Sequence, residues 1–301
     1  MSHALILLHH RATKVKAYLT VHRIFLTVSP VASQSSLQLN RGVNTSLGTL
    51  FSDSLTVFWG DWLDLRVRIL QVVASGLISP LIYILAFGLG LGSALTVKPP
   101  VGDTYLQFIL PGMVALSSMT ISFGGTTFSI CGERLYSKTF EEILLLPVSP
   151  LALFLGKMLA GIVRGLLTSS SVLLLAILFT GQWNFLNPLF LLILILNCAV
   201  FSGLGVIVGL NVKSLEGVGI LNNFLIVPMS FLGATFFDPS TLPIALKFIV
   251  YLLPLTYTSL GLRAAAYLPF SQFPWYVLPI LFIVAMILCF IGARQFSSQK
   301  D

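Results

Sequence analysis

Residues 188–210 read PLFLLILILNCAVFSGLGVIVGL, an apolar run without a charged side chain. A helix needs about 20 mostly apolar residues to cross the hydrocarbon core of a bilayer, and this run has that length. The rest of the chain is similar: 56% of its 301 residues are hydrophobic and mean hydropathy is +0.96. Only 9% are charged, against about 25% in an ordinary soluble domain. This composition excludes a soluble enzyme, a disordered chain and a nucleic-acid-binding protein.

Five further segments have the length and polarity of membrane-spanning helices, namely 69–91, 106–128, 158–179, 220–237 and 275–291. The apolar segment 242–266 differs, because it contains Lys247, Pro254 and Arg263. Proline divides it into two halves, each too short to cross a bilayer, so we expect a re-entrant or interfacial helix pair. The predicted fold class is all-α: a polytopic membrane protein with six transmembrane helices and a re-entrant helix pair before the last span.

An N-terminal amphipathic helix is predicted over residues 50–65, lying in the headgroup region of the membrane. Phe51, Leu55, Phe58 and Trp62 recur at the three- and four-residue spacing of one helix face. The alternative is that these residues simply begin the first spanning helix. The expected division of the chain is a basic tail at 1–49, a transmembrane domain at 50–297 and a cytoplasmic tail at 298–301.

The basic tail at 1–49 lacks acidic residues and contains all four histidines of the chain. This composition fits a disordered cytoplasmic tail, a targeting segment that is removed, or a start codon assigned too far upstream. No acidic or cysteine residue lies close to the histidines, so we expect no metal there.

The basic residues predict the orientation of the chain. With six spans drawn, all lysines and arginines except Lys98, Lys247 and Arg263 fall on one side. Basic residues accumulate on the cytoplasmic side of membrane proteins, so both termini are predicted to be cytoplasmic. A seventh span at 242–266 would weaken this pattern.

The sequence lacks the residues that usually drive uphill transport. No acidic residue lies in the six predicted spans, although intramembrane carboxylates usually carry proton or sodium coupling. The Gly156-Lys157 pair lacks the leading glycine and the following Ser or Thr of a phosphate-binding loop. Because no Ser/His/Asp arrangement is available either, we expect no catalytic residues in this chain. An ion-coupled carrier, a channel and a non-transporting membrane scaffold are the alternative classes.

The loop between the second and third predicted spans carries the most specific pattern, GERLYSKTFEEILLLPVSP at residues 132–150. Thr139 and Glu142 have the spacing of a capping box, and Pro147 would end the helix after about two turns. The apolar residues of one helix face are Phe140, Ile143 and Leu144. The pattern predicts a short helix with an exposed aromatic side chain, which either docks into a groove of a cytoplasmic partner or rests on the bilayer surface.

This loop resembles the characteristic block of ABC-2 type transporter permeases. The resemblance rests on Glu133-Arg134, on residues 140–149 and on the following Gly156-Lys157. It extends over residues 50–297, including Leu110-Pro111-Gly112 in the second span and the proline-broken segment before the last one. The most similar branch contains drug, polysaccharide and nodulation-factor exporters together with plastid and cyanobacterial permeases.

The resemblance implies the transmembrane subunit of an ATP-binding cassette exporter in a bacterial inner membrane or a plastid membrane. Such a subunit is dimeric and pairs with a separate nucleotide-binding ATPase subunit, which holds ATP and Mg²⁺, so this chain itself needs no cofactor. In the family the loop helix is the coupling helix that meets the ATPase. By position, that role falls here to Glu133, Arg134, Thr139, Phe140, Glu141, Glu142, Ile143 and Leu144.

Two further sets of residues follow from the spans. Small residues at four-residue spacing allow close packing within one subunit or between two, namely Gly161 with Gly165 and Gly205 with Gly209. Candidates for the lining of a transport pathway are Asn222, Asn223, Met229 and Ser230. A mixed apolar and amide surface suits an amphiphilic substrate such as a lipid, a lipid-linked glycan or a hydrophobic drug.

Overall fold

The apolar sequence forms helices throughout the part of the chain that the structure describes. The computed structural model describes residues 47–91, 102, 104–145 and 148–300, and its regular secondary structure there is entirely helical. A chain in hydrocarbon must satisfy its backbone N–H and C=O groups internally, and a helix does so within one segment. The predicted basic tail lies outside the described residues, except for residues 47–49.

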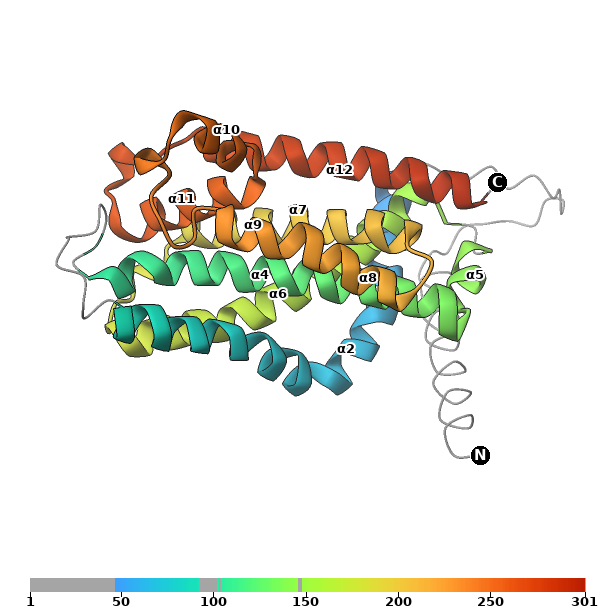
Figure 1. The fold of residues 1–301 in the computed structure, drawn as a ribbon. Helices are drawn as coiled ribbons and strands as arrows, with labels where there is room; N and C mark the ends of the chain where they lie inside the picture. Colours follow the sequence, from blue (N-terminus) through green and yellow to red (C-terminus); the bar gives the residue numbers. More distant parts are fainter. Residues whose placement is uncertain (1–46, 92–101, 103, 146–147, 301) are drawn as a thin grey trace, which may run out of the picture.

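Five helices are long: α2 (Leu47–Tyr83), α4 (Tyr105–Gly132), α6 (Pro150–Thr180), α7 (Pro188–Asn211) and α12 (Val277–Lys300) (Figure 1). The shorter α-helices are α5 (Thr139–Leu144), α8 (Leu215–Leu221), α9 (Val227–Leu232), α10 (Ile244–Leu252) and α11 (Pro254–Tyr267). Three π-helical segments follow α2, α4 and α8: η1 (Ile84–Leu91), η2 (Glu133–Ser137) and η4 (Asn222–Ile226). Short 3₁₀ turns are η3 (Asn184–Leu186), η5 (Pro239–Thr241) and η6 (Phe270–Gln272).

The six predicted spans are confirmed, since six helices of the described chain are long and apolar enough to cross a membrane. The fifth is Leu215–Leu232, which joins α8, η4 and α9 and begins and ends earlier than predicted. The predicted break before the last span is also confirmed: α10 and α11 meet at an angle of 89°. Leu253 is extended at this break and Pro254 begins α11, because proline disfavours a helical conformation in the residue before it.

Helix α4 lies at the centre of the bundle. Of its apolar window, 78% is buried, against 17% for the spans formed by α2, by α8 with α9, and by α12. Figure 1 shows α2 and α12 flanking the inner helices α4, α6 and α7. The outer spans therefore leave wide apolar faces for lipid or for other protein.

The four glycines with predicted packing roles lie inside this subunit. A Cβ atom on Gly161 would overlap the hydroxyl groups of Ser202 and Thr126, and one on Gly165 would overlap that of Ser122. These contacts bring α6 against α4 and α7. Gly205 and Gly209 of α7 similarly face the backbone and side chains of α4. Of the two packing modes that the sequence left open, the structure shows the one within a subunit.

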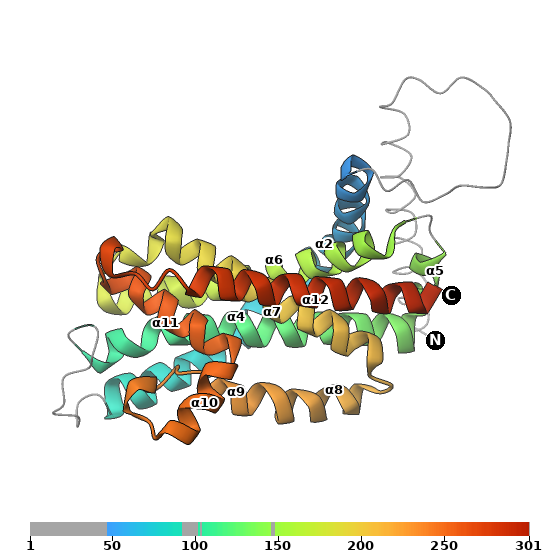
Figure 2. The same cartoon turned by 90° about the horizontal axis from the view of Figure 1, so that it is seen from above.

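The predicted amphipathic segment is helical and continuous with the first span, since α2 runs from Leu47 to Tyr83. Its beginning nevertheless projects away from the bundle while its later part lies along it (Figure 2). The projecting part exposes Phe51, Leu55 and Trp59 and buries Val57 and Asp61, so it has the predicted apolar stripe. Helix α12 continues to Lys300, so residues 298–300 of the predicted cytoplasmic tail are helical.

Arg263 on α11 hydrogen-bonds to two other segments of the chain at the end of the bundle opposite α5. Its side chain is buried, and its Nε donates a hydrogen bond of 2.9 Å to the carbonyl oxygen of Phe108. Its Nη2 donates to the carbonyl of Thr235, and the guanidinium lies 3.9 Å from the centre of the Phe108 ring. The re-entrant pair is thus fixed to the beginning of α4 and to the loop after α9.

We predict that Gly161→Val destabilises the bundle by about 1–3 kcal/mol, because the added side chain overpacks the contact between α6, α4 and α7. Thermal unfolding of the detergent-purified chain, followed by loss of monodisperse protein, measures the effect. Gly219→Ala is the matched control, since nothing lies within 4 Å of a Cβ placed on Gly219 of α8. An unchanged midpoint for Gly161→Val would contradict the close packing described.

Arg263→Met is expected to lower stability by roughly 1–3 kcal/mol for each buried carbonyl left without its donor. Arg263→Lys should rescue little, because one ammonium cannot reproduce two diverging N–H donors and a planar face on an aromatic ring. Lys247→Met, which removes the other cation of the helix pair, serves as the control and should change little. Equal midpoints for the Arg263→Met and Lys247→Met variants would refute a fastening role for Arg263.

Candidate functional site

Helix α5 and the π-helical segment η2 before it form the loop that the sequence singled out. Lys138 separates them in a left-handed conformation with φ of 53°, so the chain turns sharply before α5 begins. The predicted capping box has Thr139 as N-cap, but Lys138 takes that position and Thr139 is the first residue of the helix. The Thr139 hydroxyl instead lies 2.9 Å from that of Ser137. Pro147 lies outside the described residues.

The predicted exposure of Phe140 was wrong. Its side chain is only 3% exposed and its ring lies 6.0 Å from that of Phe296 near the end of α12. The guanidinium carbon of Arg134 lies 5.8 Å from the centre of the Phe140 ring. Ile143 is buried in the same apolar cluster. The apolar face of α5 therefore packs against the helical bundle of the same chain, which removes that apolar area from water or lipid.

The outward side of this loop is formed by other residues. Glu141 is exposed, and so are Tyr136, Lys138 and Leu145, the last at 87%. Glu142, Leu144 and Arg134 are half-buried, whereas Glu133 and Thr139 are buried. Of the eight residues with a predicted coupling role, Glu141 is thus the most accessible to a partner. Sequence reasoning missed Tyr136 and Leu145 because the helix pattern does not show which face the bundle covers.

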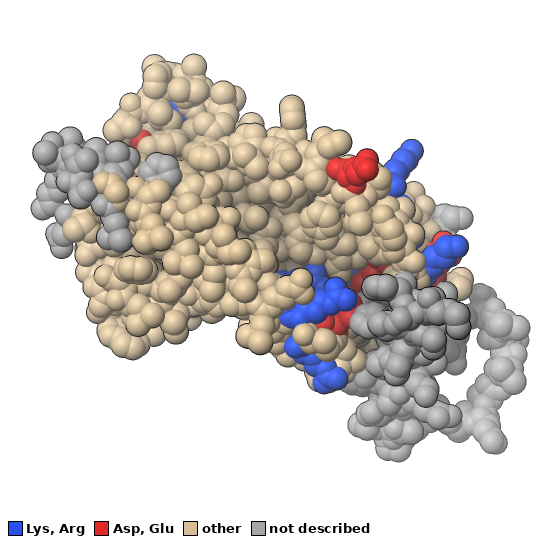
Figure 3. All heavy atoms as spheres, turned by 60° about the horizontal axis from the view of Figure 1, so that its bottom comes forward, with Lys and Arg blue, Asp and Glu red and all other residues tan. Residues whose placement is uncertain are grey.

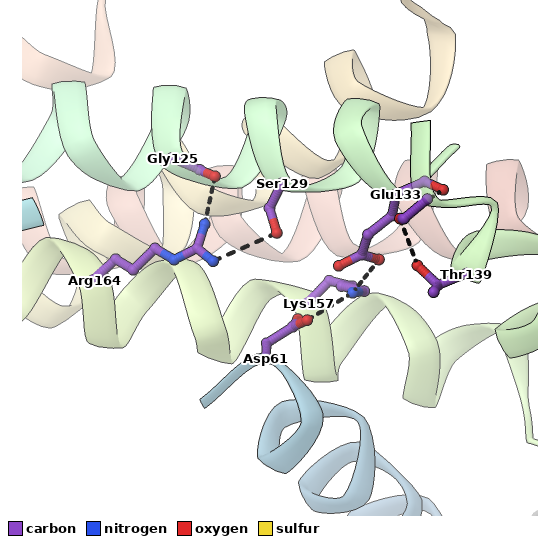
Figure 4. A network of polar contacts seen from close by, with 8 residues as sticks. Asp61, Gly125, Ser129, Glu133, Thr139, Lys157 and Arg164 are labelled. Carbon is purple, nitrogen blue, oxygen red and sulfur yellow. Dashed lines mark hydrogen bonds and ion pairs between the residues drawn. The ribbon is translucent and has the colours of Figure 1, made fainter. Parts of the chain in front are cut away.

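A buried ion cluster lies directly behind this loop. The Lys157 ammonium donates hydrogen bonds to Asp61 Oδ1 at 2.9 Å and to Glu133 Oε2 at 2.6 Å, as Figure 4 shows. The three side chains are 3%, 2% and 5% exposed. They come from α6, from α2 and from η2, so one ammonium joins three segments of the chain.

Among these three side chains, two carboxylates face one ammonium. Burying charges is unfavourable unless each is paired and hydrogen-bonded. Removing Lys157 would leave two buried carboxylates together, whereas removing either acid would leave a neutral pair. Within the described residues, no group of three or more His, Cys, Asp or Glu side chains is arranged to hold a metal ion.

Two arginines beside the cluster hydrogen-bond between the inner helices. Arg134 Nη1 donates to the carbonyl oxygens of Gly209 at 3.0 Å and Val212 at 3.3 Å, where α7 ends and its last carbonyls lack helical partners. Arg164, two turns along α6 from Lys157, donates to the Gly125 carbonyl and to Ser129 Oγ of α4 (Figure 4). Both arginines thus fix α4, α6 and α7 to one another.

The four predicted pathway residues lie together on the fifth span. Asn223 is exposed, Asn222 and Ser230 are half-buried, and Met229 is buried. Both asparagines belong to η4, and π-helical turns within helices occur frequently at functional sites. Of the four, only Asn223 is thus exposed, on a span whose apolar window is 17% buried.

Comparison with known proteins places these features in one family. The sequence profile described as "ABC-2 type transporter" matches residues 47–267. The chain is 26% identical to the inner membrane transport permease YadH of Escherichia coli K12, over 71% of this chain and 83% of that protein. It is 28% identical to nodulation protein J of Rhizobium meliloti, over 68% of this chain and 77% of the relative. A third relative is nodulation protein J of Rhizobium leguminosarum bv. trifolii, at 29% identity, 68% of this chain and 77% of that protein. The matched region contains α5 and the residues of the ion cluster, and the chain belongs to the ABC-2 type transporter family.

Proposed function

We propose that this chain is the permease subunit of an ATP-binding cassette exporter, and that α5 is where a separate ATPase subunit docks. The observation that carries this proposal is the seating of α5. Phe140 and Ile143 bury its inner face in the bundle while Glu141 and Leu145 remain exposed. A short helix that is firmly held on one side and accessible on the other can transmit a push from a partner into the bundle.

The energy source in this proposal is ATP hydrolysed by the partner. The sequence carries no phosphate-binding loop, so ATP and Mg²⁺ would be held by the ATPase subunit. Closure of two ATPase subunits would press on α5, and the Phe140–Phe296 contact would pass the movement to α12. Such coupling requires the ATPase to bind the two states of the permease with different affinities.

The proposed orientation places the α5 end of the bundle in the cytoplasm. Figure 3 shows Lys, Arg, Asp and Glu gathered mainly towards one end of the displayed face, whereas most of the remaining surface is free of charge. Exposed basic residues near this end include Arg66 and Arg68 of α2, Lys138 before α5 and Arg294 of α12. Excess basic residues mark the cytoplasmic side, and both termini would lie there, in a bacterial inner membrane or a plastid membrane.

Two copies of the chain would form the transport pathway. The outer spans expose large apolar faces. One of them is the fifth span of the chain, Leu215–Leu232, and Asn223 is exposed on it. A polar amide facing lipid is unfavourable, so such residues usually face protein or a water-filled cavity. A pathway lined by Asn222, Asn223, Met229 and Ser230 would suit an amphiphile, such as a lipid, a lipid-linked glycan or a hydrophobic drug.

Leu145→Asp is predicted to lower co-purification of the ATPase subunit by roughly tenfold, because an exposed apolar contact would be replaced by a charge. Glu141→Lys should act in the same direction. The measurement is affinity purification of the full chain from its native membrane, with ATPase activity and mass spectrometry of the bound subunit. Glu216→Lys on α8 is the control, since it reverses an exposed charge on another helix. If the Leu145→Asp and Glu141→Lys variants co-purify as much ATPase subunit as the parent chain, docking at α5 is refuted.

The orientation predicts opposite labelling of two cysteines in a variant whose Cys131, Cys198 and Cys289 are replaced by alanine. Ser240→Cys, exposed in η5 at the end opposite α5, should react with a membrane-impermeant maleimide in intact cells. Glu141→Cys should react only after the membrane is permeabilised. The reverse pattern would show that α5 faces away from the cytoplasm and would exclude docking of a cytoplasmic ATPase there.

A further inference from the structure

The ion cluster joins the projecting part of α2 to the segment that leads into α5. Asp61 lies in that part of α2, and Glu133 is the first residue of η2, which continues through Lys138 to α5. Lys157 contacts both carboxylates from a third element, α6. Figure 4 shows the ammonium between the two acids, with α2 approaching from one side and the end of α4 from the other.

The contact between α2 and α6 is close as well as ionic. Gly156 precedes Lys157, and a Cβ atom there would lie 2.5 Å from Cβ of Val57 on α2. Val57 and Asp61 are one helical turn apart on α2, so the steric contact and the ion pair hold the same face of the helix. Any displacement of α2 along α6 would separate Asp61 from Lys157 and break a buried ion pair.

Helix α6 provides a fixed base for this arrangement. Gly161 and Gly165 bring it into close contact with α4 and α7, and Arg164 hydrogen-bonds to Gly125 and Ser129 of α4. Lys157 therefore projects from a helix that packs closely against the inner bundle. Through Lys157, both carboxylate partners are joined to that helix.

We propose that Lys157 is a positioning residue that locks the beginning of α2 and the α5 segment into one rigid unit, so that a displacement of α5 carries α2 with it. This inference rests on the proposed function for its role in transport, but the rigid unit itself does not need a partner. The beginning of α2 exposes Phe51, Leu55 and Trp59, so its movement would reposition an apolar stripe at the membrane surface whenever α5 is pressed.

The charge balance of the cluster selects the variants for a test. Asp61→Ala removes the ion pair between α2 and Lys157 but leaves the Lys157–Glu133 pair, so the bundle is expected to fold. Glu133→Gln removes the ion pair between η2 and Lys157 but leaves the Lys157–Asp61 pair. Asp61→Glu keeps a carboxylate on α2 and is the conservative variant. Thr258→Val is the control, because it removes a buried hydrogen bond to Asn197 in the core of the bundle, away from this cluster.

The experiment measures the distance between spin labels on α2 and α5 by pulsed electron resonance, with the full chain in lipid nanodiscs. Labels are placed at the exposed positions Phe51 and Glu141, after the three native cysteines are replaced by alanine. The parent chain and the Thr258→Val control should give one narrow distance distribution. Asp61→Ala and Glu133→Gln should broaden or shift it, and Asp61→Glu should restore the parent distribution.

An unchanged narrow distribution in both Asp61→Ala and Glu133→Gln would overturn the proposal. If Asp61→Ala does not yield folded protein, Asp61→Asn keeps the shape of the side chain without its charge and is judged by the same criterion. In the complex with the co-purified ATPase, a broadened variant should retain ATPase binding and lose substrate transport per ATP hydrolysed. Loss of ATPase binding from the parent chain would instead refute the proposed function and leave the distance result standing.

Discussion

The close approach of α4, α6 and α7 is the constraint on which the remaining structure depends. Gly161 and Gly165 let α6 come near enough to its neighbours for hydroxyl groups, rather than large side chains, to fill the contact. In a membrane, helices gain little from burying apolar side chains, because lipid is equally apolar, and close packing of small residues takes that place. With these three helices fixed, the positions from which Lys157, Arg164 and Arg134 project are fixed as well.

The buried charged side chains at the two ends of the α4, α6 and α7 bundle have different partners. At the α5 end, Lys157 holds two carboxylates from separate segments, and Arg134 closes the end of α7. At the opposite end, Arg263 is held by carbonyl oxygens and an aromatic ring. The α5 end thus combines ion pairs between side chains with hydrogen bonds to backbone, whereas Arg263 at the opposite end bonds to backbone carbonyls. The outer spans contribute few such contacts and are free to meet lipid or a second subunit.

Sequence reasoning found the elements that local patterns determine. The spans follow from long apolar runs, the break before α11 from the restriction that Pro254 places on the preceding residue, and α5 from its spacing of apolar residues. It failed where the answer depends on partners distant in the chain. Phe140 was expected to be exposed because the helix pattern cannot show that Phe296 covers it. The ion cluster was missed because Lys157 lies 96 positions from Asp61 and 24 from Glu133, and no local motif links them.

The seat of α5 is completed by a residue that is synthesised very late. Phe296, which covers Phe140, emerges from the ribosome only after every other span of the described bundle. Until then the apolar face of α5 lacks this ring contact. A chain truncated before Phe296 would therefore keep α5 without one of the aromatic side chains that cover it.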